Sequence, residues 1–268
     1  MIKEIGIAGH GWVGKAMHQL FPAASVYDPN VKEFAALENK ERVKKADISF
    51  VCVPTPCLNR TRLDTSAVEE VVNWLESDLI VIRSTLNPGD ADALTHITHK
   101  RICVQPEYLG ETPAHPMSNM KDRQFMVIGG DRKDREKLIE LYSTVYNSNV
   151  SIRQVTNYAA EIIKLTENRA IAWKVAQMQE LYDVCKAHDI DYYTVRDVVY
   201  GDDPRFNLWW TFIYPDKRGF NSKCIPKDVY AWCAWAESAG YTPKITRGIL
   251  DKNQEWLDMN PKENDAKV

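Results

Sequence analysis

The 268-residue chain is predicted to be an α/β protein, with a doubly wound parallel sheet followed by a small all-helical second domain. Three observations predict this class. Up to about residue 150, short apolar runs alternate with helical stretches, as in a parallel sheet built from βαβ units. A glycine-rich turn follows the first apolar run. A long segment without Pro or Gly then begins near residue 157 and changes the pattern.

The expected elements of the first half follow the apolar runs. Residues 48–53 are apolar apart from Ser49, so they are expected to form a buried strand that ends at Pro54-Thr55-Pro56. The other predicted strands are 3–8, 25–27, 79–84, 102–105 and 125–128, and the predicted helices are 12–21 and 65–75.

The second half is expected to be helical. Residues 157 to about 188 are predicted to form one long helix, which suits a connection between two regions or a dimer contact. Shorter helical pieces are expected from 190 to 247, and a charged tail that frays is expected at the end. The predicted domains are therefore 1–154, 155–250 and a polar tail at 251–268.

Composition and charge narrow the classes of function. The chain is 44% hydrophobic and 26% charged, which is ordinary for a soluble globular protein. Its net charge of −3 argues against a broad nucleic-acid-binding surface. No secretory signal and no membrane-spanning run is recognised, so a cytoplasmic location with reduced thiols and no membrane partner is expected. The six cysteines show no zinc-ligand spacing, so no metal site is expected.

A dinucleotide motif follows the first predicted strand and opens a helix. It reads Gly9-His10-Gly11-Trp12-Val13-Gly14. In a Rossmann-type domain the first glycine makes the tight turn, the second lets a pyrophosphate approach the backbone, and the third lets helix and strand pack closely. Asp28 ends the second predicted strand, where a carboxylate binds a ribose and repels a 2′-phosphate. The expected cofactor is NAD rather than NADP.

A cysteine in a polar loop supplies a candidate nucleophile. Cys224 lies in Gly219-Phe220-Asn221-Ser222-Lys223-Cys224-Ile225-Pro226-Lys227-Asp228. A dinucleotide that accepts hydride and a loop thiol that captures the aldehyde can together oxidise an alcohol past the aldehyde. Lys164 and Asn168 share a helix face and can stabilise a substrate oxyanion. Taken singly, each of these has a plainer interpretation: a solvated helix face for the pair, and a structural cysteine for Cys224.

Further motifs follow in order along the chain. They are Val53-Pro54-Thr55-Pro56, Arg83-Ser84-Thr85-Leu86-Asn87-Pro88-Gly89, Pro106-Glu107-Tyr108-Leu109, residues 122–130, Lys164-xxx-Asn168 and Cys224-Ile-Pro-Lys-Asp228. With the glycine motif before them, they resemble the UDP-glucose/GDP-mannose dehydrogenase family over roughly residues 1–240.

The resemblance implies catalytic roles for six residues. Cys224 matches the nucleophile that takes the aldehyde as a thiohemiacetal, and Lys164 and Asn168 match the pair that stabilises the oxyanion. Asp228 and Thr85 match residues that hold an ordered water near the thiol. Glu107, which alone would be a loop acid, matches the acid/base residue of thioester hydrolysis.

The resemblance also implies binding roles. The segment Tyr108, Leu109, Gly110 and Glu111 matches the loop that grips the sugar nucleotide together with Glu107, Lys164 and Asn168. Arg205 and Tyr214 lie where the family has further sugar-nucleotide contacts. Besides the glycine motif and Asp28, the residues matched to cofactor contacts are Val53, Pro54, Thr55, Thr85, Glu111 and Lys227.

Two departures from the family pattern are visible. The family has a glycine-glycine-small stretch before the cysteine, and this chain has Asn221-Ser222-Lys223, which is expected to narrow or reshape the pocket. Family members usually continue into a second α/β domain that binds the nucleotide part of the substrate, and this sequence stops about where that domain would begin.

The expected function is NAD-dependent oxidation of a nucleotide sugar, similar to UDP-glucose, from primary alcohol to carboxylate through a cysteine thiohemiacetal and thioester. Two alternatives stay open. One is a two-electron β-hydroxyacid-type dehydrogenase, which would not need Cys224. The other is a non-catalytic NAD-binding subunit that pairs with a full-length partner.

A homodimer built on the long helix is also expected. This helix is apolar on most sides, and a helix of that kind needs more than one packing partner. A neighbouring subunit is expected to offer basic residues such as Lys217 or Arg218 to the substrate phosphates. The apolar residues concerned are Ile162, Ile163, Leu165, Ile171, Trp173, Val175, Met178 and Leu181.

Overall fold

The computed structural model describes residues 4–110 and 119–261. The chain divides into two compact units, the first comprising residues 1–58 and 62–164 and the second residues 59–61 and 165–268. The division falls inside the long helix, after the predicted boundary at 154/155. Its opening turns belong to the first unit because Asn157, Ala160 and Glu161 are buried there.

The first unit contains the predicted parallel sheet. Strands β1 (Ile5–Ala8), β2 (Ser25–Tyr27), β3 (Ile48–Val51), β4 (Leu79–Ile82) and β5 (Ile102–Val104) pair in the order β2-β1-β3-β4-β5, and every pair is parallel. All residues of β3 and β4 are buried. Their nearly unbroken apolar sequences therefore match strands covered on both faces.

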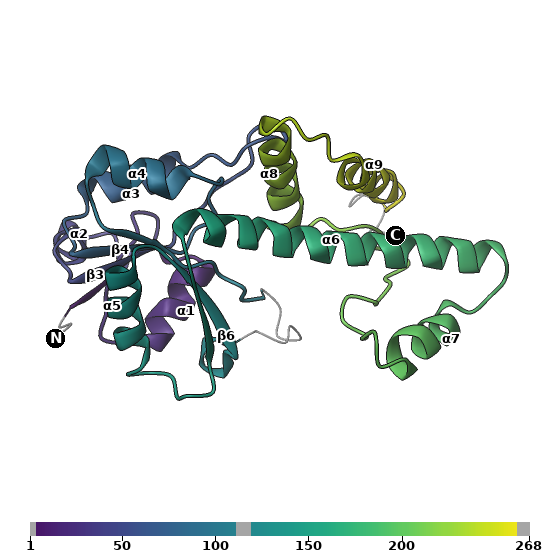
Figure 1. Ribbon diagram of the computed structural model, residues 1–268, viewed down its shortest axis with the longest axis horizontal. Helices are drawn as coiled ribbons and strands as arrows, with labels where there is room; N and C mark the ends of the chain where they lie inside the picture. Colours follow the sequence, from purple (N-terminus) through teal and green to yellow (C-terminus); the bar gives the residue numbers. More distant parts are fainter. Residues whose placement is uncertain (1–3, 111–118, 262–268) are drawn as a thin grey trace. The chain divides into compact units, whose positions relative to one another are not determined.

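Helices cover both faces of this sheet (Figure 1). One face packs against α1 (Trp12–Leu20) and α5 (Arg132–Tyr142). The other packs against α2 (Leu37–Lys44), α3 (Ser66–Trp74), α4 (Asp90–Thr98) and the start of α6. The predicted helices at 12–21 and 65–75 are confirmed. Helices α2, α4 and α5 were not predicted; α2, for example, buries only Val43 and lacks an apolar stripe.

Strand β6 (Phe125–Gly129) pairs with β7 (Ser151–Val155) in a separate two-stranded parallel sheet. Residues 125–128 were predicted as a strand of the main sheet, and β7 was not predicted because it is polar and mostly exposed. A side chain occupies the free edge of β5 instead. The Asn157 amide accepts from Val104 N at 2.9 Å and donates to Ile102 O at 3.0 Å. A short 3₁₀ turn, η1 (Met120–Asp122), precedes β6.

The described part of the second unit is helical. It contains most of α6 (Asn157–Ala187), then α7 (Tyr192–Arg196), the π-helical turn η2 (Asp197–Asp202), α8 (Ile225–Ser238) and α9 (Lys244–Asp258). The predicted long helix is confirmed. A core forms around Ala172, Phe220, Val229, Cys233 and Leu250.

The predicted fraying tail at 251–268 is wrong for its first part. Residues 251–258 complete α9, and Asn253 and Trp256 are buried on its inner face. The charged residues that suggested a tail lie on the outer face of this amphipathic helix. Residues 262–268 lie outside the described residues.

Candidate active site

The sequence motifs of the first unit meet at one edge of the sheet. The strand order reverses between β1 and β3, and ligands of such sheets bind beyond the carboxyl ends of the strands at this switch point. Gly9 directly follows β1, and the loop containing Val53 follows β3. Thr85 and Glu107 follow β4 and β5 at the same edge.

The glycine motif has the geometry of a phosphate-binding turn. Gly9 has φ +93°, and a Cβ there would lie 2.5 Å from the Cys52 carbonyl oxygen. A Cβ on Gly14 would overlap the Gly9 carbonyl oxygen, whereas one on Gly11 would meet nothing within 4 Å. Helix α1 has no acidic residue in its first turn and no side-chain cap. Its N-terminal N–H groups are thus open to an anion, which fits a pyrophosphate.

Asp28 lies beside this turn, directly after β2. Its carboxylate accepts from His10 N at 2.7 Å and from Asn30 N at 2.9 Å. The carboxylate therefore ties the end of β2 to the glycine turn and keeps acceptor capacity for ribose hydroxyls. The His10 ring lies 4.4 Å from the Phe34 ring, and burial, followed by the nearby His18, lowers the His10 pKa. Trp12 is exposed and Val13 half-buried.

The loops after β3 and β4 are joined by a hydrogen bond. Ser84 Oγ donates to the Val53 carbonyl oxygen at 2.7 Å. Thr55 is buried, and the neighbouring Pro54 is exposed. Thr85, next to Ser84, is half-buried. This hydrogen bond therefore holds together the two loops that carry the residues matched to cofactor contacts.

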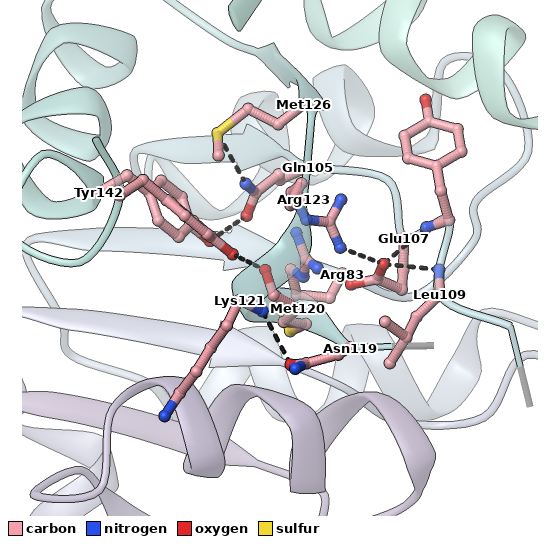
Figure 2. Close-up of polar contacts among 12 residues, drawn as sticks. Arg83, Gln105, Glu107, Leu109, Asn119, Met120, Lys121, Arg123, Met126 and Tyr142 are labelled. Atoms are coloured by element: carbon pink, nitrogen blue, oxygen red, sulfur yellow. Dashed lines mark hydrogen bonds and ion pairs between the residues drawn. The ribbon is translucent and has the colours of Figure 1, made fainter. Parts of the chain in front are cut away.

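Glu107 lies between two buried guanidinium groups (Figure 2). Its Oε2 pairs with Arg83 and its Oε1 with Arg123, and all three side chains are at most 7% exposed. Burial alone would raise the pKa of Glu107, but the two arginines outweigh it and lower the pKa to about 2. Glu107 is thus a carboxylate at neutral pH.

The same carboxylate organises the segment that follows it. Glu107 Oε1 accepts from Tyr108 N at 2.7 Å and Leu109 N at 2.8 Å. Tyr108 is buried, Leu109 and Gly110 are half-buried, and Glu111 lies outside the described residues. The described contacts favour an anchoring role for Glu107 over proton donation, because protonation would oppose both ion pairs. Its acid/base role stays a prediction.

The sequence did not single out Arg83 or Arg123 as functional. The available signal was an arginine at the end of a wholly apolar strand, Leu79–Ile82, where a charge needs a buried partner. Arg123 precedes β6 in a polar segment and carried no such signal. Only the fold brings both to Glu107.

Lys164 is held near Tyr108 by the start of α6. Its Nζ lies 5.1 Å from the Tyr108 ring centroid. One turn earlier, the buried Glu161 carboxylate accepts from Gly89 N at 2.6 Å and Ala91 N at 2.9 Å, at the N-terminus of α4. Burial raises the Glu161 pKa to about 7 despite these bonds. The end of α6 that carries Lys164 is therefore fixed to α4.

The second unit holds the candidate nucleophile. Cys224 is exposed and directly precedes α8, at its N-cap. In the first turn of α8, Asp228 is fully buried and accepts from Asn168 Nδ2 at 2.5 Å and from Lys227 Nζ at 2.6 Å. Asn168, Lys227 and Asp228 thus form one hydrogen-bonded group beside the start of the helix that Cys224 opens.

Arg205 and Tyr214, which the resemblance implied as further sugar-nucleotide contacts, lie on the surface. Arg205 is 80% exposed in its side chain and pairs with Asp203 two residues earlier, with Nε 3.0 Å from Oδ1 and Nη2 2.6 Å from Oδ2. Tyr214 is 65% exposed. Of the two basic residues expected to serve a neighbouring subunit, Lys217 is exposed. Arg218 is instead buried and bonded to Gln179 and Asp183 of its own chain, so the expectation is wrong for Arg218.

The cysteines differ sharply in environment. Burial raises the pKa of Cys52 and of Cys103 to about 12. Cys185 and Cys233 are also buried, and Cys57 is half-buried. Cys224 is the exposed thiol among the six. Across residues 4–110 and 119–261, no group of three side chains is arranged to hold a metal ion, and no helix is both long and apolar enough to cross a membrane.

Comparison with known proteins identifies the family. The NAD-binding domain of the UDP-glucose/GDP-mannose dehydrogenase family matches residues 25–150, and its central domain matches residues 158–255. The chain belongs to the UDP-glucose/GDP-mannose dehydrogenase family. Membership confirms the NAD-binding assignment of the first unit, and the glycine turn and Asp28 fit that cofactor.

Relatives in this dehydrogenase family are similar over about half of their own length. A UDP-glucose 6-dehydrogenase of Pseudomonas aeruginosa is 29% identical over 82% of this chain and 51% of that protein. A GDP-mannose 6-dehydrogenase of the same organism is 31% identical over 72% of this chain and 47% of that protein. The chain thus spans about half the length of these curated relatives.

Solved structures agree with the family fold. A UDP-glucose dehydrogenase from Pyrobaculum islandicum superposes with a TM-score of 0.78 at 22% identity, covering 95% of this chain and 68% of that one. A 3-hydroxyisobutyrate dehydrogenase of Mycobacterium tuberculosis gives a TM-score of 0.71 at 16% identity and covers 97% of both chains. Both likenesses show the fold.

Replacing Asp28 with Ala is expected to weaken NAD binding and to narrow the preference for NAD over NADP. The variant loses the acceptor for the ribose and the charge that repels a 2′-phosphate. Titration calorimetry with each nucleotide measures both affinities. Asp47→Ala is the control, because Asp47 directly precedes β3, at the end of that strand away from the glycine turn, and binds Glu4 N. Equal or tighter NADP binding by the unmodified protein would contradict the assignment.

Replacing Glu107 with Gln is expected to lower the free energy of unfolding by about 3–5 kcal/mol at neutral pH, because two buried guanidinium groups lose their counter-charge. The folded-state pKa of about 2 lies below the ordinary 4.5. The ion pairs therefore contribute stability that is present above the ordinary pKa and is lost as the pH falls toward the folded value.

Urea unfolding across the acid range measures both effects. In the Glu107→Gln variant, the free energy of unfolding should fall less steeply as the pH is lowered than in the unmodified protein. Glu38→Gln, which breaks an exposed pair with Arg42, should cost less than about 1 kcal/mol. Equal small losses for both variants would show that the buried cluster is not a stabilising unit.

Proposed function

We propose that this chain is an NAD-dependent nucleotide-sugar 6-dehydrogenase that oxidises a primary alcohol, as in a UDP-glucose-like substrate, to the carboxylate. The observation that carries the proposal is an exposed cysteine, Cys224, at the N-terminus of α8, beside the hydrogen-bonded group of Asn168, Lys227 and Asp228. The names of the family's relatives support the substrate class: UDP-glucose and GDP-mannose 6-dehydrogenases.

The proposed sequence has two oxidations and one hydrolysis. The alcohol loses two electrons and two protons and becomes the aldehyde. The Cys224 sulfur then bonds to the aldehyde carbon, and the oxygen takes a proton, giving a thiohemiacetal. Loss of two more electrons and two protons gives a thioester, and water cleaves its C–S bond to release the carboxylate and return the thiol. NAD, when bound, takes up the two electrons of each oxidation.

Lys164 and Asn168 are proposed to act on the substrate oxygen. They lie one turn apart on α6, so their side chains share a face. An ammonium and an amide N–H stabilise the negative charge that develops when the alcohol is deprotonated and when the thiol adds to the carbonyl. Asp228 accepts one Asn168 N–H and thereby fixes the orientation of the amide.

The helix N-terminus is proposed to assist the thiol. The partial positive charge at the start of α8 stabilises an anionic sulfur at Cys224. Thr85 is proposed to hold the hydrolytic water with Asp228, as the family resemblance implies. Glu107 is proposed to order the Tyr108–Gly110 segment that grips the sugar nucleotide, because its carboxylate binds the backbone N–H groups of that segment.

A two-electron dehydrogenase is the second candidate. A 3-hydroxyisobutyrate dehydrogenase shares this fold, so the fold is compatible with such a reaction. Lys164 and Asn168 would also suit oxidation of a hydroxy acid to a carbonyl compound. The number of NADH molecules formed per substrate separates the two candidates: two for the nucleotide-sugar reaction and one for the alternative.

We further propose that the working form is a homodimer. The eight apolar residues of α6 named above are all buried or half-buried within the chain, so they do not carry this proposal. Support comes from the end of α6 and the segment after it, where large apolar side chains are exposed, a pattern typical of interaction surfaces. They are Val184, Ile190, Tyr193, Val198, Val199, Phe206, Leu208, Trp209, Phe212 and Tyr214.

Replacing Cys224 with Ser is expected to block completion of the second oxidation, because an alkoxide is a poorer leaving group than a thiolate and serine is a poorer nucleophile. Nucleotide sugars are screened by NADH formation, and the carboxylate is quantified by mass spectrometry. Cys57→Ser is the control and should still form both NADH and the carboxylate. Normal carboxylate formation by Cys224→Ser would exclude the thioester route.

Charged substitutions in the exposed segment are expected to dissociate the dimer. Val184→Glu and Val198→Glu place a charge where apolar surface would be buried, whereas Ile97→Glu places one on the exposed face of α4 in the first unit. Sedimentation velocity should show a dimer for the unmodified protein and the Ile97 control, and monomers for the other two. A fully active monomeric unmodified protein would exclude the dimer.

A further inference from the structure

We propose that Asn253 and Asn260 are positioning residues that fix the loop leading to Cys224. The inference rests on the proposed role of Cys224 as nucleophile. It concerns two side chains of the C-terminal region, one in α9 and one just after it. They act through the backbone of Arg218 and Phe220.

Each asparagine pairs with both backbone groups of one residue. Asn253 Oδ1 accepts from Phe220 N at 2.7 Å, and its Nδ2 donates to Phe220 O at 3.0 Å. Asn260 Oδ1 accepts from Arg218 N at 2.6 Å, and its Nδ2 donates to Arg218 O at 2.9 Å. Arg218 and Phe220 flank Gly219, so the two amides together satisfy the backbone groups on either side of this glycine.

Packing makes this attachment rigid. Asn253 is 5% exposed, and the Phe220 side chain is buried in the core formed with Val229 and Leu250. Gly219 has φ +77°, and a Cβ there would lie 2.7 Å from Asn253 Oδ1. The glycine between the two bound residues thus allows the close approach of the amide. Loss of either amide would leave backbone groups of the loop without a partner, which destabilises its folded conformation.

The connection from this anchor to the thiol is short. Only Asn221, Ser222 and Lys223 lie between Phe220 and Cys224. Ser222 Oγ accepts from Ile225 N at 3.1 Å and so ties the loop to the first residue of α8. Cys224 is therefore held between a fixed residue on one side and a helix bonded to the loop on the other. This arrangement places the sulfur at the N-terminus of α8.

A purely structural role is the competing explanation, and the first unit offers a matched control. Asn87 Oδ1 accepts from Leu63 N at 2.9 Å, and its Nδ2 donates to Leu63 O at 3.1 Å. Asn87 thus makes the same pair of hydrogen bonds to the N–H and C=O groups of one residue, in a unit that does not contain Cys224. Asn87→Ala should therefore lower stability in the same way as Asn253→Ala without affecting the thiol loop.

The first measurement is independent of enzymatic activity. Full-length Asn253→Ala, Asn260→Ala and Asn87→Ala proteins are treated with iodoacetamide, and each cysteine is followed by peptide mass spectrometry. In the Asn253 and Asn260 variants, alkylation of Cys224 should slow about threefold, because a frayed helix start stabilises the thiolate less. Unchanged labelling of the buried Cys185 and Cys233 shows that the second unit of these variants stays folded, and Cys52 and Cys103 report the same for the first unit. The Asn87 variant should label at the normal rate.

The second measurement is the ratio of aldehyde released to carboxylate formed. For a substrate that yields carboxylate, Asn253→Ala should release more aldehyde per carboxylate, and this ratio does not depend on the fraction of folded enzyme. A normal Cys224 labelling rate in both variants overturns the positioning role. Slowed labelling in a protein that makes no carboxylate from any nucleotide sugar supports the positioning role and counts against the proposed function alone.

Discussion

The attachment of helix α6 to the sheet is the constraint on which the candidate site depends. Asn157 binds the edge of β5, and Glu161 binds the N-terminus of α4 one turn later. Both side chains are buried, so each needs these partners. Lys164 continues the same face of the helix. Because an α-helix is stiff over one turn, fixing its start also fixes the position and direction of Lys164, one of the two side chains proposed to hold the substrate oxygen.

Side-chain amides solve a recurring problem in this protein. A segment that leaves regular secondary structure exposes backbone groups that still require partners. Asn87, Asn253 and Asn260 each provide one donor and one acceptor to such a segment, and Asn157 does the same at the outer edge of β5. An amide side chain has the geometry of a peptide group, so it can replace a neighbouring strand without extending the sheet.

The sequence predicted the parts of the fold that have a local pattern. Apolar runs such as Ile48–Val51 gave the strands, and the glycine motif located the cofactor turn at the end of β1. Elements that depend on distant partners were not predicted. Strand β7 is polar and mostly exposed, so it has no apolar run. Residues 251–258 were assigned to a polar tail because only one face of α9 is buried. Likewise, Glu107 could be named from its motif, but Arg83 and Arg123 become its partners only after folding.

The amide of Asn157 also bears on how the folded chain avoids self-association. An uncovered strand edge can recruit a strand from another molecule, which is a common start of aggregation. On the side of β5 away from β4, such a strand would have to bind Val104 N–H and Ile102 C=O. Asn157 already occupies both groups from within the chain. The side chain that anchors the long helix therefore also closes this edge of the sheet to a foreign strand.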